Sequence, residues 1–169
     1  SLGLKRQVFM VSMGGFDLHD ELPAKQPGLL REVSDAIAAF YDATVELGVA
    51  GNVTTFTASD FGRALTPNGD GADHGWGSHH FVVGGSVRGG AFYGTPPPVS
   101  VGDTASPDDQ WHVGQGRLLP TTSVDQFAAT MAQWLGVADA ELDGLLPNLK
   151  NFGAGAALPG YPRNLGFLP

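Results

Sequence analysis

Apolar positions in the first sixty residues form two short runs that flank one long periodic segment. The runs are Val8–Ser12 and Val53–Ala58, and both are rich in residues that favour strands. Over Gly28–Leu47 apolar residues recur every three or four positions, which predicts a helix with one buried face. That face consists of Leu30, Val33, Ile37, Phe40, Thr44 and Leu47. A strand–helix–strand order predicts a parallel crossover, in which both strands end at one sheet edge.

The remaining pattern predicts shorter elements. Phe81–Gly85 is a candidate strand, and residues 62–80 are expected to be loop because they contain the turn sequence Pro67–Gly71. Two further helices are predicted, at Ser123–Leu135 and Ala140–Leu146. Residues 1–152 are thus expected to form an α/β domain with a parallel sheet, and residues 153–169 an irregular tail rich in glycine and proline.

Composition narrows the class of protein. The chain has 169 residues, of which 42% are apolar and 15% charged, which is typical of one globular domain. Its net charge of −8 argues against a nucleic-acid partner, and the absence of cysteine excludes disulfides and thiolate metal sites. No apolar stretch is long enough to span a membrane. The chain opens almost directly into a predicted strand, as expected for a fragment or a processed product.

Carboxylates and imidazoles follow the two predicted strands. Asp17 and His19 come after the first strand and Asp60 after the second, so a shared sheet edge would bring them together. His74, in a glycine-rich stretch nearby, is the first choice for a further ligand. These residues predict a site for one or two divalent metals, with zinc, calcium, magnesium and manganese not distinguished. Arg63 can bind a phosphate, sulfate or carboxylate through its planar fork.

Several residues leave alternatives open. His79 and His80 are secondary candidates, and at most one would be a direct ligand because neighbours on an extended segment point in opposite directions. Asp17 and His19 can also be a turn aspartate beside a surface histidine. Asp60 can instead pair with Arg63 and cap a helix. No Gly-x-Ser-x-Gly elbow is present, which argues against a serine hydrolase.

Four stretches carry a resemblance to a known bacterial family. They are Val8–His19, Phe56–Thr66, Asn68–Gly90 and Ser123–Gly136. The chain resembles the domain-of-unknown-function 1501 family, whose members typically carry a twin-arginine export signal. That family is grouped with the alkaline phosphatase and sulfatase superfamily. The resemblance implies an α/β/α sandwich with a parallel sheet, divalent metal at the strand ends, and a periplasmic or extracellular location.

The resemblance also implies roles for individual residues. Asp17 and His19 would be the first ligand pair of the superfamily, Asp60 the second carboxylate and His74 the last ligand. Phe61 stands where the superfamily has a histidine after that carboxylate, and the first pair is more closely spaced than usual. Nothing corresponds to the superfamily's nucleophile. The chain is therefore expected to be the carboxyl-terminal part of the fold, with the missing amino-terminal half as its partner.

The leading hypothesis is the metal-binding part of a secreted phosphatase-like or sulfatase-like hydrolase acting on a small anionic ester. Arg63 would hold the anionic group. The first rival is a metal-stabilised structural or binding protein without catalysis, favoured by Phe61. The second is a non-catalytic fragment of a larger assembly.

Overall fold

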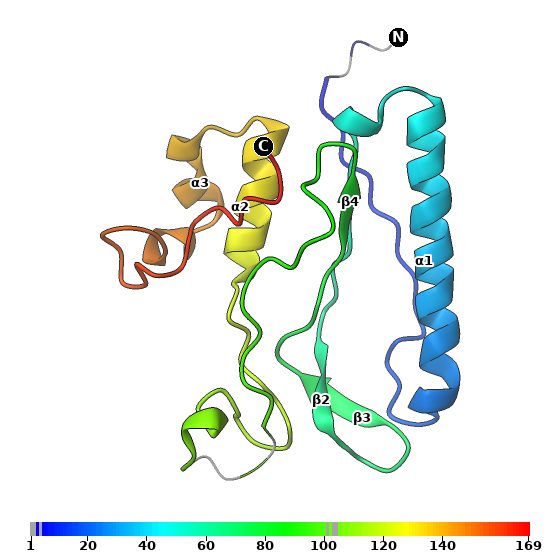
Figure 1. Ribbon diagram of the computed structural model, residues 1–169, viewed down its shortest axis with the longest axis vertical. Helices are drawn as coiled ribbons and strands as arrows, with labels where there is room; N and C mark the ends of the chain where they lie inside the picture. The colour runs from blue at the N-terminus through cyan, green and yellow to red at the C-terminus, as the bar shows by residue number, and fades with distance from the viewer. Residues whose placement is uncertain (1–2, 4, 101, 103–104) are drawn as a thin grey trace.

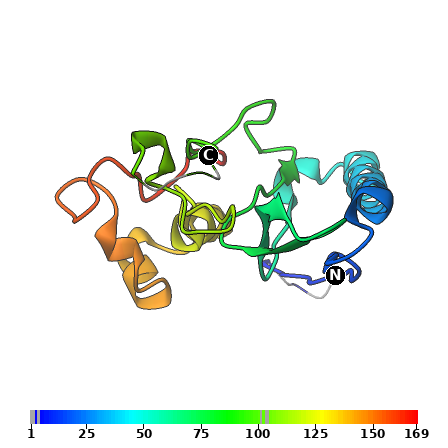
Figure 2. The ribbon, with the colours of Figure 1, turned by 90° about the horizontal axis from the view of Figure 1, so that it is seen from below.

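The computed structural model describes residues 3, 5–100, 102 and 105–169. A long helix, α1, lies on one side of two small sheets, and the helices α2 and α3 lie on the other side (Figures 1 and 2). The helices are α1 (Leu22–Glu46), α2 (Val124–Leu135) and α3 (Asp139–Leu145), with short 3-10 helices at Ala50–Asn52, Pro107–Asp109 and Leu149–Asn151. Within the described ranges, every helix is too short or too polar to cross a membrane.

Each sheet is a single antiparallel pair of strands. The strands are β1 (Thr54–Phe56), β2 (Gly62–Pro67), β3 (Ala72–Gly75) and β4 (Val82–Gly84). β1 pairs with β4, and β2 pairs with β3 so that Arg63 lies opposite His74. The β2–β3 hairpin is inserted in the connection between β1 and β4 (Figure 1). Its turn follows Pro67 as the sequence predicts, although residues 62–80 were expected to be loop throughout.

The expectation of a parallel α/β/α sandwich of the alkaline phosphatase type is wrong. Val8–Ser12 forms no strand and, among the described residues, no hydrogen bond. The side chains from Val8 to Val11 are 76–95% exposed. A strand exists only where a neighbour pairs with its backbone, and the described chain provides none here. Without this strand, no parallel crossover forms around α1, and β1 pairs with β4 in the opposite direction.

The two later helices are confirmed to within one residue at each end. Ser123 begins α2 with a capping box, in which its hydroxyl accepts from the Asp125 N–H and its own N–H donates to the Gln126 side chain. Gly136 ends the helix in the left-handed conformation, with φ of 100°. These signals act within one turn of the backbone, so a local pattern is enough to locate them.

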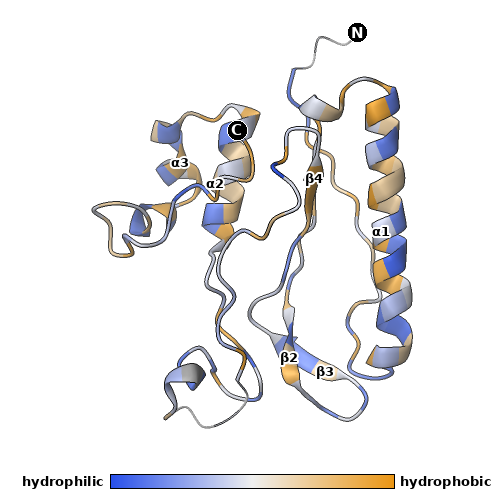
Figure 3. Cartoon of the chain, in the orientation of Figure 1, coloured by the Kyte–Doolittle hydropathy of each residue, from blue (hydrophilic) through white to orange (hydrophobic). Residues whose placement is uncertain are grey.

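α1 is confirmed as a helix, but its packed face differs from the predicted one. Leu30 and Phe40 are 48% and 51% exposed. Apolar and polar residues are mixed along α1 (Figure 3). The partly or fully buried positions are instead Leu29, Val33, Ile37, Tyr41 and Thr44, a stripe rotated slightly around the helix. This stripe faces the loop before α1 and the β1–β4 sheet, because α1 contacts β4 and Leu29 lies against Gly15.

The main apolar core lies away from α1, between α2, α3 and the last 3-10 helix. Ala129, Leu142 and Leu149 are fully buried there. Residues 153–169 contain no helix or strand, but Phe167 and Leu168 are only 2% and 3% exposed. On the sheet side, which carries the candidate ligands, Leu18, Ala64 and Ala72 are buried.

Candidate metal centre

Three of the predicted ligands meet on the β2–β3 hairpin. Asp17 Oδ1 lies 3.0 Å from His19 Nε2 and 2.8 Å from His74 Nε2, and the two imidazole nitrogens are 3.2 Å apart. All three side chains are exposed. They form a group of metal-ligating type in the described part of the chain, assembled by a loop and a hairpin instead of by parallel strand ends.

The loop that carries Asp17 and His19 is fastened to the start of β3. Leu18 between them is buried, and its carbonyl accepts a hydrogen bond from the Ala72 N–H at 3.3 Å. Gly71 lies so close to the His19 backbone that a Cβ added there would come within 2.1 Å of the His19 carbonyl carbon. Glycine at position 71 is therefore required for His19 to approach the hairpin.

Arg63 joins the same segments from β2. Its guanidinium donates to the carbonyls of Ala72 and Phe16, at 2.5 and 2.6 Å, and to Asp17 Oδ1 at 3.0 Å. The side chain is only 17% exposed. These bonds direct its planar fork toward the protein, where it positions Asp17. Its predicted contact with a substrate anion stays a prediction.

Phe61 supports His74 from one side. The two rings are stacked with centroids 3.7 Å apart and planes inclined by 9°. The Arg63 guanidinium carbon in turn lies 5.0 Å from the centre of the Phe61 ring. Phe61, where the resemblance implied a histidine, therefore packs against His74 and restricts the orientation of its ring.

Asp73 and Asn68 support His19 from the hairpin. Its Nδ1 lies 3.3 Å from Asp73 Oδ1, which also accepts a hydrogen bond of 2.7 Å from the Asn68 side chain. A carboxylate of this kind orients many metal-bound histidines. Asp73 is next to His74 in the sequence. Its contacts with His19 and Asn68 form only because the folded hairpin brings these residues together.

The other predicted ligands lie elsewhere. Asp60 is exposed in the bend before β2 and is not part of the three-residue group. His80 contacts the Thr57 hydroxyl at 3.3 Å and stacks on Phe127, with centroids 6.0 Å apart. His79 is exposed. Their part in metal binding stays a prediction.

The electrostatics of the group centre on Asp17. A hydrogen bond from His74, helped by Arg63 and by the charge of the nearby imidazoles, lowers the pKa of Asp17 below its ordinary value. The carboxylate is thus ionised at neutral pH, as a metal ligand must be.

The spacing of the three atoms fits a metal ion. Ligands bonded at about 2.1 Å are about 3.0 Å apart at right angles and about 3.4 Å apart at a tetrahedral angle. The observed separations of 2.8–3.2 Å are closer to the first value. Two histidines and one carboxylate on one face of an ion are a known ligand set for iron, and similar sets bind catalytic zinc.

A family model matches residues 3–143, and its description is "Protein of unknown function (DUF1501)". The chain belongs to this family. The match covers both segments of the candidate site and most of the fold. No curated protein and no solved structure matches the chain significantly. The family description therefore names no activity for the chain.

Proposed function

We propose that Asp17, His19 and His74 bind one divalent transition-metal ion. The observation that carries this proposal is the 3.0 Å contact between His19 Nε2 and Asp17 Oδ1. When Nδ1 of His19 donates its hydrogen to the Asp73 carboxylate, Nε2 presents a lone pair to Asp17. Two lone pairs at this distance repel each other unless a proton or a cation lies between them. A metal ion satisfies both atoms and His74 together.

The ligand types indicate which ions are preferred. Imidazole binds zinc, iron and manganese better than it binds calcium or magnesium, which favour oxygen ligands throughout. We therefore expect zinc and manganese to bind more tightly than magnesium and calcium. Exposure of all three side chains leaves further coordination positions open to solvent or a ligand, as in catalytic sites.

We further propose that the site serves hydrolysis of an anionic ester of the phosphoric or sulfuric class. A bound divalent ion supplies Lewis-acid chemistry to such an ester. Within this chain, Arg63 holds Asp17 and Asp73 holds His19, so two of the ligands are pre-oriented. A local cation also offsets the net charge of −8, which otherwise repels an anionic substrate. No residue of this chain is assigned as the nucleophile.

A structural role for the metal is the second candidate. Asp17 and His19 belong to the loop before α1, whereas His74 belongs to β3, so one ion would fasten the loop to the hairpin. The exposure of Asp17, His19 and His74 at the junction of the two segments places such a clamp at the surface. Structural zinc sites, however, usually have four protein ligands, and the described group has three.

Metal binding is tested first by calorimetry on metal-free protein with zinc, manganese, magnesium and calcium. We expect one zinc ion per chain, and at least about tenfold weaker binding in Asp17→Asn, His19→Ala and His74→Ala. Asp60→Asn is the matched control, because it removes an exposed carboxylate outside the three-residue group and should bind normally. Failure to bind any ion stoichiometrically, or equal weakening by Asp60→Asn, would overturn the proposed site.

Catalysis is tested separately with 4-nitrophenyl phosphate and 4-nitrophenyl sulfate in the presence of each metal. Turnover that requires metal and disappears in His74→Ala supports the hydrolase. Stoichiometric metal that raises the melting temperature without turnover supports the clamp and contradicts the hydrolase.

We also propose a periplasmic or extracellular location. This rests on the resemblance to bacterial proteins with twin-arginine signals. Fractionation of cells that produce the native protein tests it, and recovery from the cytoplasm alone would contradict it.

A further inference from the structure

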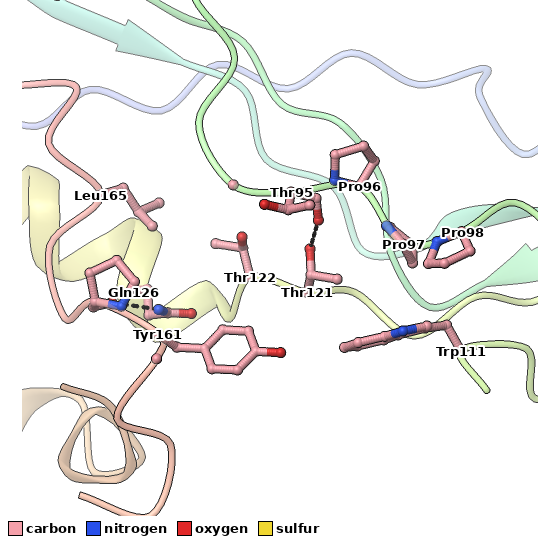
Figure 4. Close-up of a pocket in the computed structure, with 13 residues that line it drawn as sticks. Thr95, Pro96, Pro97, Pro98, Trp111, Thr121, Thr122, Gln126, Tyr161 and Leu165 are labelled. Carbon is pink, nitrogen blue, oxygen red and sulfur yellow. Dashed lines mark hydrogen bonds between the residues drawn. The ribbon is translucent and has the colours of Figure 1, made fainter. Parts of the chain in front are cut away.

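A second candidate site lies between the tail of the chain and the proline segment, residues 94–98, that precedes the 3-10 helix Pro107–Asp109. It is a cavity of about 510 Å³ beside α2 (Figure 4). Its walls come from four separate parts of the chain: residues 94–98, Trp111, the α2 entry at 121–126, and residues 160–165. A volume of this size is typical of a site for a small organic ligand.

The walls of the cavity are tied together by hydrogen bonds. The Thr121 hydroxyl donates to the Thr95 carbonyl, which joins the α2 entry to the proline segment. The Gln126 side chain donates to the Pro162 carbonyl and accepts from the Ser123 N–H, which joins α2 to the tail. Gln126 is only 1% exposed, so this link is internal. Bonds of this kind form the cavity before a ligand enters and reduce the entropy lost on binding.

The lining combines flat apolar surfaces with unused polar groups. Trp111 and three consecutive prolines provide apolar walls, and the Tyr161 hydroxyl points across the opening toward Trp111 (Figure 4). The Trp111 indole N–H and the hydroxyls of Thr122 and Tyr161 make no hydrogen bond with any described residue. They are therefore available to a ligand. Among the described residues that line the cavity there is no aspartate, glutamate, lysine, arginine or histidine.

We propose that this cavity binds one ring of a neutral saccharide. A pyranose ring has an apolar face of C–H groups, which packs on an aromatic ring, and a rim of hydroxyls, which donate and accept hydrogen bonds. Trp111 offers the aromatic surface, while Thr122 and Tyr161 offer hydroxyls beside it. Without a cation in the lining, nothing compensates the charge of an acidic ligand in a protein of net charge −8.

The site is independent of the candidate metal centre. None of the lining residues belongs to the group of Asp17, His19 and His74. Saccharide binding can thus fail while metal binding persists, and the reverse is equally possible.

The proposal is tested by following the indole N–H resonance of Trp111 by NMR during titration. The probes are methyl glycosides of glucose, galactose, mannose and N-acetylglucosamine with their β-linked oligosaccharides, and glucuronate serves as the charged comparison. We expect at least one neutral saccharide to shift this resonance with saturation, and glucuronate to have no effect. Tyr161→Phe and Thr122→Val each remove one hydroxyl and should raise Kd about 3- to 10-fold, the value of one hydrogen bond.

Two variants with aromatic changes complete the test. Trp111→Ala should abolish binding, measured by ligand-observed NMR, and Trp76→Phe should leave it unchanged because Trp76 is 66% exposed and outside the cavity. If Trp111→Ala does not fold, the two hydroxyl variants still decide the matter. The proposal is overturned if no neutral saccharide shifts Trp111, if a proline-rich peptide saturates the site instead, or if both hydroxyl variants bind as tightly as the parent.

Discussion

The imidazole of His74 lies flat against the ring of Phe61, with 3.7 Å between the ring centroids. This contact holds the Nε2 edge of His74 toward Asp17 and His19. Phe61 stands where the resemblance implied a further ligand, and in the structure it supports the candidate ligand His74. Stacked aromatic pairs stabilise by about 0.5–1.5 kcal/mol beyond the area they bury.

Phe61→Leu should therefore weaken zinc binding about 2- to 10-fold, because His74 gains rotational freedom while all three ligands remain. Calorimetry on metal-free protein measures the change. Phe92→Leu is the control, since Phe92 is 96% exposed. Unchanged affinity in Phe61→Leu would show that the stacking does not orient His74.

Arg63→Lys should lower the free energy of unfolding by about 1–3 kcal/mol. The guanidinium serves three acceptors in two segments, and a single ammonium group cannot reach all of them in the same geometry. Urea denaturation measures the loss. Arg31→Lys, an exposed position on α1, should change little. Equal stability of the two variants would mean that the Arg63 bonds do not hold the loop.

Asp73→Ala should weaken zinc binding about 10- to 100-fold, even though Asp73 is not itself a predicted ligand. Its loss leaves His19 Nδ1 without its acceptor, so the ring can rotate or change tautomer. The comparison is Asp35→Ala on the exposed side of α1, which removes the same charge far from the hairpin. Matching affinities in these two variants would reduce the Asp73 effect to net charge.

The elements that the sequence predicts well are those that local chemistry determines. Ser123 and Gly136 delimit α2, and the turn after Pro67 lies where its residue types place it. The strand predicted at Val8–Ser12 fails because pairing depends on a distant partner that no local pattern specifies. β2 and β3 were not predicted for the same reason, because their glycines and proline are typical of loops and their pairing is not visible in the local sequence.

For the candidate site too, the residue types were predictable from the sequence, whereas the contacts between distant residues were not. Their residue types singled out Asp17, His19 and His74 in the sequence, but a loop and a hairpin bring them together in place of the expected parallel strand ends. Asp60 was expected with them only because two parallel strands were expected, and it is not part of the three-residue group. The supporting role of Asp73 requires the folded hairpin, which brings residues more than fifty positions apart into contact.

His80 should make the protein less stable in mild acid. Partial desolvation of its otherwise exposed ring, which stacks on Phe127, and then the charge of His79, lower the pKa of His80 below its ordinary value. The unfolded chain therefore binds a proton at His80 more readily than the folded protein does. The free energy of unfolding therefore decreases as pH falls below about 6.5. The decrease due to His80 is complete once the pH is below the pKa of His80 in the folded protein. NMR titration should give His80 a lower midpoint in the folded than in the urea-unfolded protein; the reverse order would refute the assignment.

Leu142→Ala and Phe40→Ala should differ clearly in their effect on stability. Leu142 is fully buried in the core between α2 and α3, so its truncation leaves a cavity and should cost about 2–5 kcal/mol. Phe40 belongs to the face that the sequence predicts to be buried, but it is 51% exposed. Its truncation should cost less than about 1 kcal/mol, because much of the ring already contacts water. Urea denaturation of both variants measures the difference, with similar slopes required for the comparison. A Phe40 variant as destabilised as the Leu142 variant would place Phe40 in a core and contradict its exposed position on α1.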